Sequence, residues 1–181
     1  MSMKNVNTEN NKPEVFFDAS AYDFVNKYNL GSFINVNYLA IVKFNLSLFF
    51  SKKEYDLSTF IPDFSTVVQT CICSAMYMGF KKIVLLGCDQ TSILNVINSR
   101  MENAHVVDYA YEISVAEQKR LEEMAKKTTL SEEFASQAHV FETYSFLSNY
   151  CCQKGIELVN ATDGSLIESI KKVELEDVLQ K

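Results

Sequence analysis

The stretch "GFKKIVLLGCDQTS", residues 79–92, decides the fold that we predict for this chain. Its apolar run "KKIVLLG" is typical of a short strand in a parallel sheet that is buried on both faces. The run stops at Gly87, and Asp89 and three further polar residues follow soon after it. Ligands of parallel sheets bind outside the carboxyl ends of the strands, so we expect a ligand at this end of the strand.

Two helices and a second strand surround this stretch. Residues 65–80, "STVVQTCICSAMYMGF", begin with hydroxyl residues suited to an N-cap, carry apolar residues at helical spacing and have Gly79 as a C-cap. A longer helix is predicted for about residues 132–154, ending at Gly155. "IELVNATDGSLIESI", residues 156–170, then repeats the order of strand, polar loop and amphipathic segment. This alternation predicts an α/β fold, a Rossmann-like parallel sheet flanked by helices.

The polar residues after the two strands are the candidate site. We expect five of them to converge on one crevice: Gly87, Asp89, Asn160, Thr162 and Ser165. The carboxylate of Asp89 could bind a ribose hydroxyl, orient a base or hold a metal, or it could cap backbone amides in a turn. The "NATDGS" loop could cradle a phosphate with its amides, or form an ordinary Asx turn with Gly164 at positive φ.

Length and composition favour one folded domain. The chain has 181 residues, of which 48% are hydrophobic and 22% charged, values of ordinary globular proteins. Residues 1–13 are polar and are predicted to be a disordered leader. Residues 14–181 are predicted to form a single α/β domain.

The charge and the missing motifs exclude several function classes. A formal net charge of −6 argues against a nucleic-acid partner, whereas a small anionic ligand remains compatible with it. The sequence contains no Gly-x-Gly-x-x-Gly, no P-loop and no Gly-x-Ser-x-Gly motif, which argues against a dehydrogenase, an NTPase and an α/β-hydrolase.

The cysteines and the N-terminus bear on the compartment. Five cysteines without a Cys-x-x-Cys pair indicate neither a zinc site nor a disulfide framework, so we expect a cytoplasmic protein. Residues 1–14 lack the apolar region of a secretory signal, and no stretch has the roughly 18 apolar residues of a membrane span. Four cysteines are predicted to be small core residues: Cys71, Cys73, Cys151 and Cys152.

Two histidines are the candidates for a general base. His139 lies on the long predicted helix between Ala138 and Val140, which favours a structural role. His105 lies among carboxylates and tyrosines in "ENAHVVDYAYE", where spacing alone supports catalysis and surface placement equally.

Residues 60–180 resemble a known family. The stretch from Ser65 to Asp89, the polar segment with His105, and "YSFLSNYCCQKGIELVNATDGSLIESI" look like the C-terminal half of bacterial sialyltransferase-like glycosyltransferases of surface polysaccharide. They are also similar to motility accessory factor glycosyltransferases and hydroxymethylpterin pyrophosphokinase-like proteins. The resemblance implies a bacterial enzyme, for example of lipopolysaccharide biosynthesis.

The resemblance also implies roles for individual residues. Thr66, Gly164 and Ser165 would approach the nucleotide, "GCD" would match the family's Gly-x-Asp, and His105 would match its general base. Such an enzyme deprotonates an acceptor hydroxyl of a glycan and displaces the nucleotide of a CMP-sugar, with no obligatory metal and no cofactor beside this donor. Association with a membrane surface, with another subunit or with further copies of the chain is compatible with this role.

The first part of the chain departs from the family pattern. Family members begin with a strand and a Gly-x-Gly-Pro-Ser-type loop for the phosphates, and residues 1–64 contain no such loop. The alternative is therefore a non-catalytic nucleotide-binding or assembly module, an incomplete nucleotide-binding domain, or a fragment completed by another subunit. A pterin or nucleotide diphosphokinase ranks last, because only Asp89 and Asp163 stand where carboxylates could hold Mg²⁺.

Overall fold

The computed structural model describes residues 12–42, 57, 60–94, 97, 114–116, 119–120, 123 and 127–179. The chain divides into two compact units, Met1–Asp63 and Phe64–Lys181, and each is described by itself. That residues 14–181 form a single domain therefore stays a prediction.

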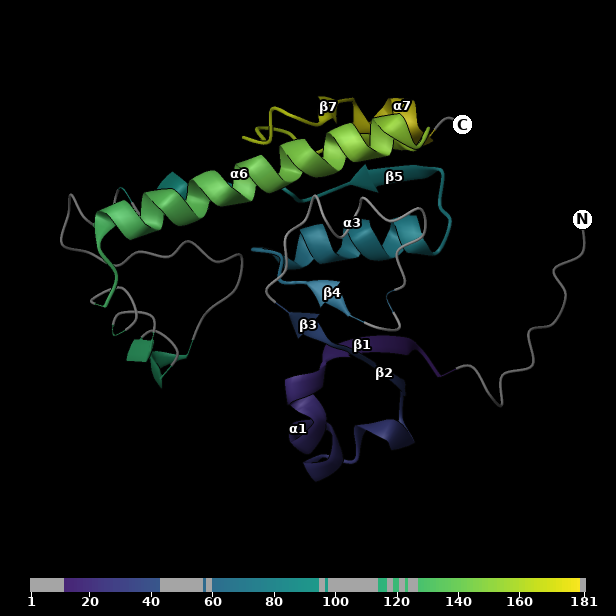
Figure 1. The fold of residues 1–181 in the computed structure, drawn as a ribbon, viewed down its shortest axis with the longest axis vertical. Helices are drawn as coiled ribbons and strands as arrows, with labels where there is room; N and C mark the ends of the chain where they lie inside the picture. Colours follow the sequence, from purple (N-terminus) through teal and green to yellow (C-terminus); the bar gives the residue numbers. More distant parts are fainter. Residues whose placement is uncertain are drawn as a thin grey trace, which may run out of the picture. The chain divides into compact units, whose positions relative to one another are not determined.

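The first unit contains two short parallel strand pairs (Figure 1). β1 (Glu14–Asp18) pairs with β2 (Asn35–Leu39), and the connection between them contains α1 (Tyr22–Lys27) and two single-turn 3-10 helices (Ala19–Ala21 and Leu30–Ser32). β3 (Ile41–Val42) pairs in the same way with β4 (Ile61–Pro62). The parallel pairing of β1 and β2 requires such a crossover, because a tight hairpin can join only antiparallel strands.

The last two residues of the predicted leader, Lys12 and Pro13, make contacts with the first unit. The Lys12 ammonium donates to the carbonyl of Gly31 at 3.0 Å, and the amide of Asn35 donates to the carbonyl of Pro13 at 2.9 Å. These two bonds join Lys12 and Pro13 to the first unit, and the disordered leader itself stays a prediction. Residues 1–11 lie outside the described residues.

The second unit is built on a three-stranded parallel sheet in the order β5-β6-β7. β5 (Lys82–Leu85) pairs with β6 (Glu157–Asn160), and β6 pairs with β7 (Lys171–Lys172). α3 (Val67–Tyr77) precedes β5, α6 (Leu130–Gln153) precedes β6, and α7 (Leu175–Leu179) follows β7. The predicted α/β class with parallel strands is confirmed, and the Rossmann-like topology stays a prediction.

α6, the long helix in Figure 1, has defined ends. At its start, Thr129 and Glu132 form a reciprocal capping box, in which each side chain accepts a hydrogen bond from the other's backbone amide. After its end, Gly155 adopts φ 65, a left-handed conformation that glycine reaches without strain. The apolar side of α6 packs on α3 and β6, and it buries Leu147 and Cys151 completely.

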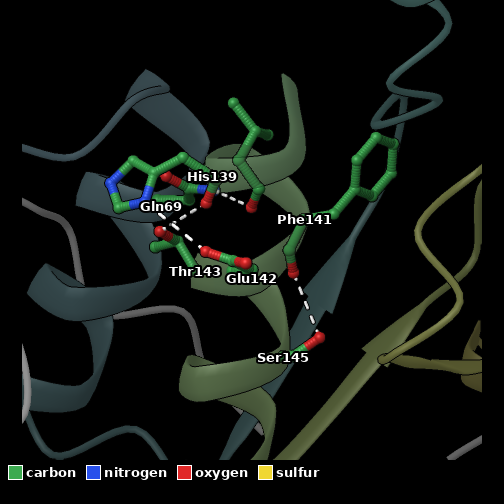
Figure 2. Close-up of polar contacts among 7 residues, drawn as sticks. Gln69, His139, Phe141, Glu142, Thr143 and Ser145 are labelled. Atoms are coloured by element: carbon green, nitrogen blue, oxygen red, sulfur yellow. Dashed lines mark hydrogen bonds and ion pairs between the residues drawn. The ribbon is translucent and has the colours of Figure 1, made fainter. Parts of the chain in front are cut away.

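Polar contacts also join α3 to α6 (Figure 2). Gln69 of α3 is fully buried, and its Nε2 donates to the carbonyl of Val140 at 2.9 Å. Among the residues that the structure describes, its Oε1 has no hydrogen-bond partner. On α6 itself, the hydroxyls of Thr143 and Ser145 donate to carbonyls one turn earlier. The two helices are thus fixed by a directional contact as well as by apolar packing.

The cysteine prediction holds for two of the four residues. Cys73 and Cys151 are buried, whereas Cys71 and Cys152 are exposed. Positions two apart on a helix, or adjacent on it, point in different directions, so one member of each pair faces the core and the other faces solvent.

Candidate functional site

The two strand-end loops of the second unit meet, as the sequence predicted. β5 and β6 end at the same level, because Leu85 pairs with Asn160. Beyond the strands, the amide of Cys88 donates to the hydroxyl of Thr162 at 2.9 Å, and the amide of Leu166 donates to the carbonyl of Asp89 at 2.8 Å. The loop after β5 and the loop after β6 therefore form one structure at the carboxyl end of the sheet.

Ser165 is the centre of this structure. Its hydroxyl donates to the carbonyl of Cys88 at 2.7 Å and accepts from the side-chain amide of Asn160 at 2.8 Å and from the backbone amide of Ile167 at 3.2 Å. Asn160 also accepts from the amide of Thr162 at 3.0 Å. Both Asn160 and Ser165 are buried, at 0% and 2% exposure, and these bonds satisfy groups that would otherwise be costly to bury.

An open cleft lies beside these loops. It has a volume of about 870 Å³ and is lined by residues 86–87, 161–164 and 171–177. Three of the predicted site residues line it: Gly87, Thr162 and Gly164. Gly87 and Gly164 have φ values of 70 and 66, a left-handed backbone that favours glycine.

The cleft offers both hydrogen-bond donors and acceptors to a ligand. Within the described part of the chain, the amides of Asp163 and Gly164 donate to no other residue, which makes them candidates to meet an anion or a carbonyl. Two lysines, Lys171 and Lys172, also line it. The carboxylates are Asp163, Glu174, Glu176 and Asp177. Acceptors in excess of cations suit hydroxyl-rich and amine-bearing ligands that carry little negative charge.

Four other predicted residues lie outside the cleft lining: Thr66, Asp89, Asn160 and Ser165. Asn160 and Ser165 are committed to the buried network described above. The side chain of Asp89 is exposed and accepts from the amide of Thr91 at 3.2 Å, which is the turn-capping geometry weighed as the alternative. A role of these residues in ligand binding stays a prediction.

Thr66 is the N-cap of α3. Its hydroxyl accepts from the amide of Gln69 at 3.4 Å and lies 3.3 Å from the hydroxyl of Tyr144, so its partners are internal. Burial raises the pKa of Tyr144, which keeps this phenol neutral. A nucleotide contact of Thr66 stays a prediction.

The two histidines that are candidates for a general base differ in what the structure describes of them. His105 lies outside the described residues. His139 projects from α6 with 58% of its side chain exposed, and its Nδ1 lies 4.0 Å from a carboxylate oxygen of Glu142 (Figure 2). His139 is therefore a surface residue of α6, and its structural role stays a prediction. The half-buried Cys88 thiol has a pKa raised by burial, so it is not an activated thiolate.

Residues 171–177 were missed by the sequence analysis. They contribute both lysines and three of the four carboxylates of the cleft. The "KKVELED" pattern reads as an ordinary solvated segment. Its nearness to the loops after β5 and β6 follows only from the pairing of β7 with β6.

The described residues contain no group of three or more His, Cys, Asp or Glu side chains arranged to hold a metal ion. In this same part of the chain, no helix combines the length and the apolar character that crossing a bilayer requires. Comparisons of the chain with protein-family models, with curated proteins and with solved structures found no match.

Proposed function

We propose that the cleft beside the loops after β5 and β6 binds the nucleotide of a nucleotide-sugar, as the donor site of a glycosyltransferase or of its C-terminal part. The observation that carries this proposal is the position of the cleft. It opens at the carboxyl ends of parallel strands, where α/β proteins bind nucleotides. Its volume of about 870 Å³ lies in the range of roughly 300–1,000 Å³ of small-molecule sites.

The chemistry of the lining agrees with such a ligand. The free amides of Asp163 and Gly164 are suited to an oxygen of a phosphate or of a pyrimidine carbonyl. The surrounding carboxylates are suited to ribose and sugar hydroxyls. Because the four carboxylates oppose only two lysines, the lining favours the single phosphate of a CMP-sugar over a diphosphate donor.

The proposed reaction is transfer of a sugar to a hydroxyl of a cell-surface glycan. A general base takes the proton of this hydroxyl, the oxygen attacks the anomeric carbon, and the bond from that carbon to the phosphate oxygen breaks, which releases CMP. We propose His105 for this base and a cytoplasmic setting for the reaction. A direct test of the base is loss of transfer, with CMP binding retained, in His105→Ala.

Calorimetric titration tests the donor site. We expect micromolar binding of CMP, and weaker binding of UDP, GDP and ATP, with and without Mg²⁺. Asp163→Trp should abolish CMP binding, because the indole would fill the cleft beside the loop. Glu168→Trp is the matched control, since Glu168 is exposed outside the cleft lining. If CMP bound equally to both variants, the nucleotide site would lie elsewhere.

A second candidate is a non-catalytic nucleotide-binding or assembly module. It is favoured by the absence of a glycine-rich phosphate loop, since Gly31 is the only glycine among residues 1–64. This module would bind CMP in the titration but would neither transfer nor hydrolyse a CMP-sugar. Turnover of a CMP-sugar by the purified chain would eliminate it.

A further inference from the structure

Lys172 makes an unusual contact for an exposed lysine. Its ammonium donates to the backbone carbonyl of Ser165 at 2.6 Å, across seven residues of sequence. A bond with a charged donor is shorter and stronger than a bond between neutral groups. This contact runs from β7 to the end of the loop that lines the cleft.

The register of the sheet explains why this lysine reaches the loop. Lys172 pairs with Asn160, and paired residues of neighbouring strands present their side chains on the same face. Asn160 therefore holds the hydroxyl of Ser165 while Lys172 holds its carbonyl. Successive residues of a strand alternate faces, so Lys171 is directed away from Ser165.

The two contacts fix Ser165 from two strands at once, and Ser165 closes the loop 161–164 that lines the cleft. The loop carries the free amides of Asp163 and Gly164, and their direction depends on where the loop ends. If the contact from Lys172 is lost, the contact from Asn160 still joins the loop to the sheet, but the loop can move more. A less restricted loop loses affinity, because it must be ordered when the ligand binds.

We propose that Lys172 is a positioning residue of the cleft, which sets the direction of the 161–164 loop amides through the carbonyl of Ser165. The statement about ligand affinity rests on the proposed nucleotide site. The statement about the loop does not depend on it, because the contact is made by the unliganded chain.

The experiment compares the full chain with Lys172→Met, Lys172→Arg and Lys81→Met. Lys81→Met removes the same charge from an exposed lysine next to the start of β5, outside the cleft lining. Hydrogen exchange followed by mass spectrometry reads the amides of residues 161–167 without ligand, and calorimetry reads the binding of CMP. Circular dichroism shows that each variant is folded.

We expect loop exchange on the order of tenfold faster in Lys172→Met and CMP binding weaker by a similar factor, which is the effect of losing one charge-assisted contact. In Lys172→Arg, loop exchange and CMP binding should both stay close to those of the unchanged chain. Lys81→Met should change neither of them. Unchanged loop exchange in Lys172→Met would overturn the inference, whether or not the chain binds CMP.

The two proposals fail in different ways. If the unchanged chain binds no CMP while its loop still responds to Lys172→Met, the nucleotide site is wrong and the positioning role stands. If the chain binds CMP and Lys172→Met leaves both loop exchange and CMP binding unchanged, the nucleotide site stands and the positioning role is overturned.

Discussion

Replacing Ser165 by alanine should destabilise the chain far more than the loss of one oxygen atom suggests. The hydroxyl makes three hydrogen bonds in a site that is 2% exposed. After its removal, the side-chain amide of Asn160 keeps only a 3.5 Å contact with the carbonyl of Cys88, and the amide of Ile167 loses this acceptor. An unsatisfied buried donor costs about 1–3 kcal/mol, so we expect Ser165→Ala to lower the free energy of unfolding by about 3 kcal/mol.

Urea titration followed by circular dichroism measures this free energy. A matched control is Ser145→Ala on α6, because the Ser145 hydroxyl donates to the carbonyl of Phe141, one turn earlier on the same helix (Figure 2). Its removal leaves no buried donor without a partner, and alanine is the better helix former, so we expect a change below about 0.5 kcal/mol. Equal effects of the two substitutions would refute the central place of Ser165 in the network.

Three further predictions concern the backbone and the thiols. Gly164→Ala should lower the free energy of unfolding, measured by urea titration, by about 1–2 kcal/mol. The reason is the backbone, because φ 66 disfavours any residue with a Cβ even though open space surrounds this position. An unchanged free energy of unfolding would contradict this. Burial raises the pKa of Cys73 to about 12 and that of Cys151 to about 11, from 9.0. Above pH 9 the unfolded chain loses these protons more readily than the folded chain, so the free energy of unfolding should be constant below pH 9 and should fall as the pH rises towards 11. In Cys73→Ala, the free energy of unfolding should fall less steeply with pH. An equally steep fall would refute the buried thiol as its cause. In the native chain, a thiol reagent should modify Cys71 and Cys152 quickly, and Cys73 and Cys151 only on unfolding, as peptide mass spectrometry would show.

Local sequence signals were sufficient for α3, β5, α6 and β6 of the second unit, but not for β7 and α7. The Thr66 cap, the apolar spacing and Gly79 predicted α3 to within two residues at each end. Gly155 marked the end of α6, and the short apolar runs marked β5 and β6. Caps and periodicity are properties of neighbouring residues, so they are visible without tertiary contacts.

The first unit could not be predicted in this way. Its segments are short and rich in aromatic residues, and both kinds of periodicity fit them equally poorly. The pairing of β1 with β2 is a contact between residues 21 positions apart, such as Glu14 and Asn35, and no local signal encodes it. Lys12 and Pro13 joined the fold for the same reason, through bonds to residues 19 to 22 positions away.

The meeting of the loops after β5 and β6 was predicted, whereas the direction of their side chains was not. The carboxyl ends of neighbouring parallel strands lie at the same edge of a sheet, so the loops after β5 and β6 were expected to lie side by side. The pairing of Leu85 with Asn160 agrees with this expectation. Whether a polar side chain in such a loop faces a ligand or the interior depends on a few bonds between loops. Asn160 and Ser165 turned inward because each satisfies the other, and this pairing is visible only in three dimensions.

β7 also bears on how reliably the sheet is assembled. Two adjacent lysines form this strand, so a slip by one residue would again place a lysine beside Asn160, and the strand itself discriminates poorly between registers. The residue before it, Ile170, is 1% exposed, and Ile167 is fully buried. A slipped chain would pull these side chains out of the core. Folding fidelity at this edge is therefore set by residues that precede the strand, and we expect sequence drift to be tolerated at Lys171 far more readily than at Ile170.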